Sequence, residues 1–180
     1  MLKRLRGFTL IELLIVVAII GILAALLIPN AITAIQKAKQ KTTMKDIVTI
    51  STAIADFVTD NGTTPIQSGT YTAAAPFYGN ISPFYVKVLP INDQWANPYN
   101  VFCGLAVNSS PYGISGALED DFLVASWGRD KLENIDGFAF NPADPEFGMF
   151  IVSEMAHFNK DLVMWNGSWI RAPRAGGTGN

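Results

Sequence analysis

The sequence predicts an α+β protein in which one long N-terminal helix packs on a small antiparallel β-sheet. Three observations support this fold class. An apolar run of membrane length extends from Phe8 to Ile28. A helical pattern of apolar residues three and four apart then continues to about Asp60. Short apolar segments separated by turn residues fill the remainder, as expected for a sheet of short strands.

The apolar run predicts a membrane-spanning helix with its N-terminus in the cytoplasm. About 20 apolar residues are enough for an α-helix to cross the bilayer core, and only Thr9 and Glu12 interrupt this run. Positive charge beside such a helix stays on the cytoplasmic side. Three cations precede the run: Lys3, Arg4 and Arg6. The rest of the chain is therefore expected on the far side of the inner membrane.

Glu12 is a candidate functional residue, because a carboxylate inside a membrane helix costs several kcal/mol unless it is paired. A secretory signal peptide would have a shorter apolar region and a small-residue cleavage site after it. Here Pro29 and a continuing helical pattern follow instead. A plain transmembrane anchor explains the length of the run and its flanking charge, but it does not explain Glu12.

The residues Gly7-Phe8-Thr9-Leu10-Ile11-Glu12 resemble the leader junction of the type IV pilin and pseudopilin superfamily. The resemblance implies a pilin fold, with residues 1–7 as a leader that a prepilin peptidase removes after Gly7. It also implies N-methylation of Phe8 and an ion pair between Glu12 and the Phe8 amine of a neighbouring subunit. Removal of the leader would change the formal net charge from −2 to −5, because the leader holds three cations and no acid.

The second half of the helix is predicted to be amphipathic and to pack on the soluble domain. Its apolar residues recur at helical spacing: Ile32, Ile35, Ile47, Ile50, Ile54, Phe57 and Val58. Asp60-Asn61-Gly62 predicts the C-terminal cap. We expect one helix from about Thr9 to Asp60, roughly 75 Å long at 1.5 Å per residue. Residues 8–29 form its transmembrane or filament-core half, and residues 30–61 form its amphipathic half.

Residues 62–180 are predicted to form one globular β-domain. Residues 61–100 are rich in turn formers and are expected to be a loop with little regular structure. Five segments are predicted strands: Tyr99–Cys103, Phe122–Ser126, Met149–Val152, Leu162–Trp165 and Ser168–Ile170. Asn166-Gly167 predicts a two-residue hairpin between the last two. This hairpin is expected to cover an open sheet edge or to form a surface for neighbours.

Three further segments resemble the major pseudopilin of type II secretion. They are Asp60-Asn61-Gly62-Thr63-Thr64-Pro65, Asp93-Gln94-Trp95-Ala96-Asn97-Pro98-Tyr99 with Ala96 in place of glycine, and the strand that ends Ser126-Trp127-Gly128-Arg129-Asp130. The chain departs from the family in two ways. It has a single cysteine, which permits no intrachain disulfide, and it continues well beyond the loop that follows this last strand.

A calcium site is predicted in that loop, which follows the strand ending at Ser126. The resemblance implies that calcium binds there, with Asp130, Glu133 and Asp136 as candidate ligands. Carboxylate and carbonyl oxygens are the ligands that calcium prefers. Arg129 and Lys131 lower the local negative potential, and three acids in a short loop that simply face water are the alternative.

The sequence indicates a structural protein and not an enzyme. His157 and Cys103 are the only histidine and cysteine, and the motifs for nucleotides, zinc or an activated serine are missing. The acidic balance and a lysine group without interleaved aromatics give no reason to expect specific nucleic-acid binding. The lysines are Lys37, Lys39, Lys41 and Lys45.

Our hypothesis is a subunit of a type IV pilus-like filament, most simply the pseudopilus of a type II secretion system. Its partners would be further copies of the chain in a helical filament, the inner membrane, the prepilin peptidase and a secretion or pilus assembly platform. Its location would be the inner membrane and then a periplasmic or extracellular filament. The alternatives are a surface pilus for adhesion, motility or DNA uptake, and a membrane-anchored binding protein that does not polymerise.

Overall fold

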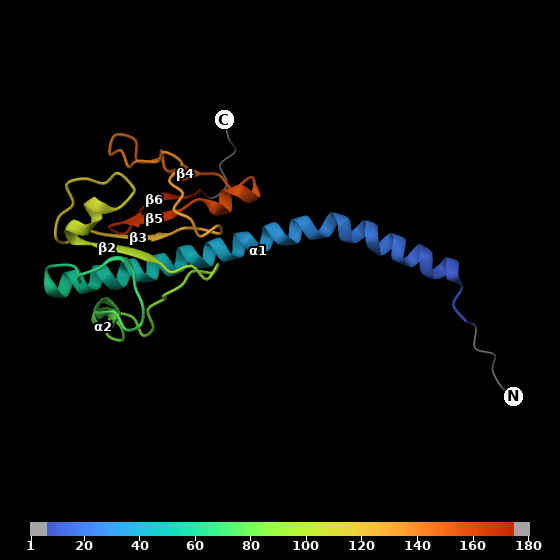
Figure 1. Cartoon of the computed structure of the whole chain (residues 1–180), viewed down its shortest axis with the longest axis horizontal. Coiled ribbons are helices and arrows are strands. Elements are labelled where there is room, and N and C mark those ends of the chain that lie inside the picture. Colours follow the sequence, from blue (N-terminus) through green and yellow to red (C-terminus); the bar gives the residue numbers. More distant parts are fainter. Residues whose placement is uncertain (1–6, 175–180) are drawn as a thin grey trace. The chain divides into compact units, whose positions relative to one another are not determined.

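A computed structural model describes residues 7–174 of the chain (Figure 1). These residues form two compact units, one ending at Lys37 and the other beginning at Ala38. The predicted leader cations lie outside the described residues. The elements are, in order, α1 (Leu10–Asn61), β1 (Ser68–Thr70), α2 (Pro76–Ile81), β2 (Asn100–Cys103), the 3₁₀-helix η1 (Gly104–Ser109), β3 (Phe122–Ser126), β4 (Met149–Phe150), the 3₁₀-helix η2 (Met155–Asn159), β5 (Leu162–Trp165) and β6 (Ser168–Pro173).

The long N-terminal helix is confirmed, with bounds one residue from those predicted. Gly62 ends it at a φ of 76°, and its N–H donates to the Val58 carbonyl at 2.7 Å, which is the expected left-handed cap. The helix also continues through Pro29. Proline cannot donate a helical hydrogen bond, but the side chains of Asn30 and Thr33 donate to helix carbonyls one turn earlier, at 3.3 and 3.1 Å.

The sheet has six strands in the order β1-β2-β3-β5-β6-β4. Every adjacent pair is antiparallel except β4 and β6, which are parallel, so the predicted antiparallel sheet is mixed at that edge. The hairpin of β5 and β6 lies beside β3 and covers its edge, as expected. The 61–100 segment has little regular structure, as predicted. Its two short elements, β1 and α2, rely on contacts with residues distant in the sequence.

The domain core lies between the second half of α1 and one face of the sheet. Ile47, Ile50 and Ile54 are fully buried, and they pack against alternating residues of the strands: Val101, Val124, Leu162 and Met164. Figure 1 shows this part of α1, in teal and green, running along β2 and β3. Ile32 and Ile35 do not join this core, since they lie in the first unit and remain 44% and 55% exposed.

A second core covers the opposite face of the sheet. Strand residues that point away from α1 pack there against the segments between the strands: Leu123, Ala125, Val163 and Ile170 meet Val107, Tyr112, Ile114 and Phe138. Because both faces are covered, every residue of β3 is buried. The sequence pattern predicts only the helix-covered face.

Candidate functional site

The predicted processing residues lie in an exposed, non-helical segment just before α1. Gly7, Phe8 and Thr9 precede the helix, and Phe8 is 81% exposed. Thr9 and Glu12 bond to each other reciprocally. The Glu12 carboxylate accepts from the Thr9 backbone N–H at 2.8 Å and from its hydroxyl at 2.7 Å, and the Thr9 hydroxyl accepts from the Glu12 N–H at 3.3 Å. This capping box gives the carboxylate a partner within its own chain.

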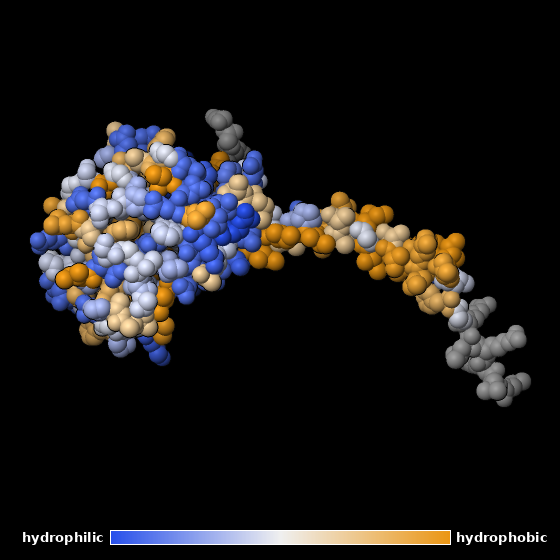
Figure 2. All heavy atoms as spheres, viewed as in Figure 1, coloured by the Kyte–Doolittle hydropathy of each residue, from blue (hydrophilic) through white to orange (hydrophobic). Residues whose placement is uncertain are grey.

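The first half of α1 presents apolar side chains on all sides. The large apolar residues between Leu10 and Ile28 are 45% exposed or more, and Figure 2 shows them as an orange surface. The helix is long and apolar enough to cross a membrane. A helix that is apolar all round is stable only in lipid or inside an assembly. This half therefore needs a membrane or neighbouring chains around it.

The structure does not bring the three predicted calcium ligands together. Among residues 7–174, no group of three acidic, histidine or cysteine side chains is arranged to hold a metal ion. Asp130 accepts from the N–H of Leu132 at 3.2 Å, and Glu133 is exposed. Asp136 is paired with two cations, Arg171 at 3.3 Å and Lys160 at 3.6 Å. This donor set does not fit calcium, and calcium binding stays an untested prediction.

A buried polar cluster that the sequence does not predict lies beneath this loop. Asp161 and Arg171 are 0% and 4% exposed. The Asp161 carboxylate accepts from the Tyr112 hydroxyl and from the backbone N–H of Asn134, each at 3.0 Å. Burial raises the pKa of Asp161 to about 7, although Arg171 opposes the shift. Arg171 lies between the apolar residues Ile170 and Ala172 in β6, and a charged residue in such a place is a signal of a buried partner.

Two of the three segments that resemble the major pseudopilin, residues 93–99 and 126–130, meet in a second buried contact. Asp93 accepts from the backbone N–H groups of Trp95 and Asn97 at 2.9 Å each, and from the Ser126 hydroxyl at 2.7 Å. The 93–99 segment also contacts α1, where Asp46 accepts a hydrogen bond from the Tyr99 hydroxyl at 3.1 Å. These contacts fix the start of the 128–137 loop relative to the helix.

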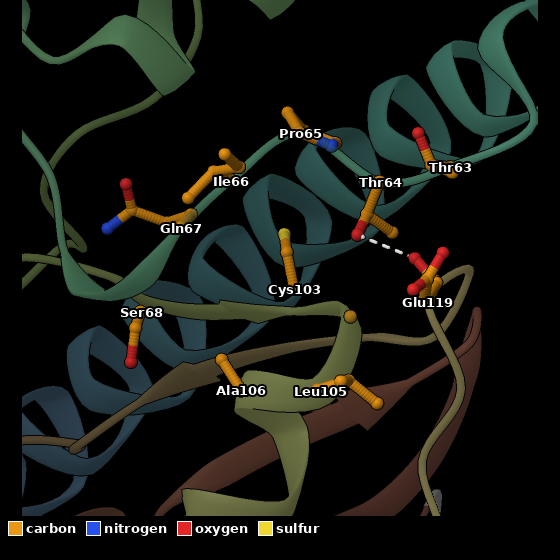
Figure 3. Close-up of a pocket in the computed structure, with 11 residues that line it drawn as sticks. Thr63, Thr64, Pro65, Ile66, Gln67, Ser68, Cys103, Leu105, Ala106 and Glu119 are labelled. Atoms are coloured by element: carbon orange, nitrogen blue, oxygen red, sulfur yellow. Dashed lines mark hydrogen bonds between the residues drawn. The ribbon is translucent and has the colours of Figure 1, made fainter.

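The sole cysteine does not form a reactive site with the sole histidine in the described structure. Cys103 lines a surface pocket of about 370 Å³ between residues 63–68 and the start of η1. Figure 3 shows this pocket, where the Thr64 hydroxyl donates to the Glu119 carbonyl at 3.0 Å. Burial raises the pKa of the Cys103 thiol to about 12, so it is protonated at neutral pH. His157 lies in η2, where its Nδ1 accepts from the N–H of Ser153 at 3.2 Å.

Comparison with known proteins points to the same N-terminal signature and extends beyond it. Residues 2–28 match the family described as the prokaryotic N-terminal methylation motif. The chain is 35% identical over 135 residues to type II secretion system core protein G of Aeromonas hydrophila, covering 69% of this chain and 94% of the relative.

Two further relatives bear the same name. Identity to the protein of Pseudomonas aeruginosa is 39% over 140 residues, covering 69% of this chain and 96% of the relative. Identity to the protein of Escherichia coli is 31% over 145 residues, covering 70% of this chain and 93% of the relative. No solved structure matches the chain significantly. The relatives are thus matched almost whole, while nearly a third of this chain lies outside the match.

Proposed function

Since the chain belongs to the family of type II secretion system core protein G, the major pseudopilins, we propose that it is a structural subunit of the pseudopilus, the pilus-like filament of a type II protein secretion system. The observation with most weight is the signature from Gly7 to Glu12 at the head of an exposed, membrane-length helix. The relatives are named for type II secretion, which favours this filament over a surface pilus.

The exposed segment before α1 suits the proposed processing. A peptidase requires an accessible, non-helical peptide, and Gly7 and Phe8 lie in one. Cleavage after Gly7 gives Phe8 a free amine, which is then methylated. Both steps take place while α1 spans the inner membrane with its N-terminus in the cytoplasm. The assembly platform then receives the mature subunit.

Glu12 is proposed to exchange partners during assembly. In a single subunit its carboxylate is bonded to Thr9, which lowers the cost of holding an acid in lipid. In the filament the carboxylate pairs with the Phe8 amine of a neighbouring subunit. Because an unpaired charge in an apolar surrounding costs several kcal/mol, only the register that brings the two groups together is stable.

The apolar half of α1 provides the attraction between subunits. Its side chains are exposed in the single chain, so packing against the same helices of other copies would bury them when the subunit leaves the lipid. The β-domain would then face outward.

Replacement of Glu12 tests this function. We expect Glu12→Ala and Glu12→Gln to abolish filaments, because neither side chain carries the negative charge that an ion pair with an ammonium group requires. Both variants should still enter the membrane, because neither adds a charge to the apolar helix. Electron microscopy and a shearing assay measure the filaments, and alkaline extraction measures insertion.

Asp120→Ala is the matched control, because it removes an exposed carboxylate of the β-domain, and it should leave filaments intact. Intact-mass measurement of each preparation checks that processing after Gly7 is retained. Unchanged filaments in Glu12→Ala would refute the proposed role of Glu12.

A further inference from the structure

The 128–137 loop, in which the sequence predicts calcium, already contains a cation from its own chain. We propose that the Arg171 guanidinium, assisted by the Lys160 ammonium, takes the place of a bound metal ion, so that this loop folds without calcium. The inference concerns the stability of the β-domain and is independent of the proposed filament role.

The guanidinium of Arg171 bonds to the two kinds of oxygen that calcium would use. Its Nη1 donates to the Ile135 carbonyl at 2.6 Å, and its Nη2 donates to Asp136 Oδ2 at 3.3 Å. Lys160 Nζ lies 3.6 Å from the same Asp136 oxygen. One backbone carbonyl and one carboxylate are therefore held by a planar fork whose geometry suits two acceptors.

The cations are held in place by burial and by aromatic rings. Arg171 is 4% exposed, and its Cζ lies 5.4 Å from the centre of the Phe138 ring. Lys160 Nζ lies 5.4 Å from the centre of the Phe150 ring. Rings that cover a cation stabilise it and restrict its position. The guanidinium is thus a fixed part of the loop structure.

Other polar groups of the loop are also bonded within the chain. The N–H of Asn134 donates to Asp161 at 3.0 Å, and the N–H of Leu132 donates to Asp130 at 3.2 Å. Arg129 Nε donates to Asn159 Oδ1 at 3.0 Å. These partners come largely from residues 159–171, which precede and form the β5–β6 hairpin. The segment 159–171 therefore holds the loop in place.

The loop and the segment beneath it hold no excess of negative charge that an added ion would have to neutralise. Their acids are matched in number by cations of the same segments: Asp130, Glu133, Asp136 and Asp161 against Arg129, Lys131, Lys160 and Arg171. A divalent cation would approach Asp136 against two positive groups that already neutralise it. Calcium would have to displace Arg171 or Lys160 to bind there.

Calcium titration of the full-length protein in detergent is the first test. We expect the same Tm in excess chelator and in excess calcium, and no tryptophan-sensitised luminescence from bound terbium. A rise of Tm with calcium, or saturable terbium binding, would overturn the proposal. This arm uses the native chain and therefore does not depend on any variant being able to fold.

Arg171→Gln is the second test, with Arg174→Gln as its matched control. Arg171→Gln should lower Tm by several degrees, on the order of 5 °C, because Ile135 and Asp136 lose their buried donor. Arg174→Gln should change Tm little, because its ion pair with Glu146 is exposed. Equal effects of the two substitutions would contradict the proposal.

A double variant separates the Arg171–Asp136 contact from general packing. Asp136→Asn should lower Tm in the native chain and should lower it less in the Arg171→Gln background, because the partner is already gone. Fully additive losses would show that Arg171 acts through packing alone, which would also overturn the proposal.

Discussion

At the scale of single residues, Ala96 stands in a backbone conformation that normally requires glycine. Its φ is 59°, within the left-handed region that is unfavourable for residues with a Cβ atom. The turn imposes this conformation, because the N–H of Ala96 donates to the Asp93 carbonyl at 3.0 Å while the Asp93 side chain caps the following residues. The major pseudopilin motif that residues 93–99 resemble has glycine at this position.

Ala96→Gly should therefore stabilise the protein. Relief of the left-handed strain, about 1–2 kcal/mol, exceeds the added entropy of the unfolded chain, about 0.4–1 kcal/mol, so we expect a net gain of roughly 0.5–1 kcal/mol. Denaturant unfolding measures it. Ala73→Gly is the control, since Ala73 is exposed and has no positive φ, and it should lose stability. A loss in Ala96→Gly as well would contradict the strain argument.

Asp161 should make stability depend on pH. Burial raises its pKa from 3.8 to about 7, so the folded state favours the protonated acid. Its contribution to the free energy of unfolding is complete below about pH 4 and is lost as the pH rises through about 7. At about 1.4 kcal/mol per pKa unit, the loss is on the order of 4 kcal/mol. Arg171 opposes this shift and Glu133 adds to it.

Asp161→Asn tests this dependence, because asparagine can still bond to Asn134 and Tyr112. The variant should match the native chain at acidic pH, be more stable at neutral pH and show a flatter pH profile. The free energy of unfolding measured across this pH range provides the comparison. Parallel profiles for the two proteins would show that Asp161 is charged in the folded state.

At the scale of elements, the β5–β6 hairpin depends on Asn166 and Gly167. Their φ angles are 47° and 77°, the pair of left-handed residues that a type I′ turn needs. The Asn166 side chain also accepts from the N–H of Phe122 at 2.8 Å, which joins the turn to β3. A local turn signal and a contact distant in sequence thus stabilise the same element.

Gly167→Ala should destabilise the protein by about 1 kcal/mol, because alanine is strained at this φ although space is open around it. Gly79→Ala is the control. Gly79 lies in α2 with no positive φ and with open space around it, so alanine should be neutral or stabilising there. Thermal unfolding compares the two. No difference between them would exclude backbone strain at the hairpin as a determinant of stability.

At the scale of the whole molecule, the helical pattern predicted α1 well because local spacing decides it. Strands β3 and β5 were predicted with the right bounds for the same reason. The helix-covered core followed from Ile47, Ile50 and Ile54. The short elements β1 and α2 could not be predicted, because β1 forms only by pairing with β2 and α2 buries Phe77 and Ile81 in the core.

The sequence predicts candidate residues both at the N-terminus and in the 128–137 loop. Gly7, Phe8 and Glu12 lie close together in the sequence, so their motif is visible without a fold. The acids of the loop are also local, but their partners Lys160 and Arg171 lie 24 and 35 residues from Asp136. The resemblance to the major pseudopilins therefore suggested calcium in this loop, whereas the folded chain supplies organic cations.

The sequence by itself determined the long helix, its apolar half, the N-terminal processing signature and most of the strands, because each depends on neighbours within a few residues. Only the tertiary structure decided the pairing of β4 with β6, the second core and the partners of Asp136, because each joins residues far apart in the chain. For the same reason, the cation that neutralises the loop can be identified only in the folded chain.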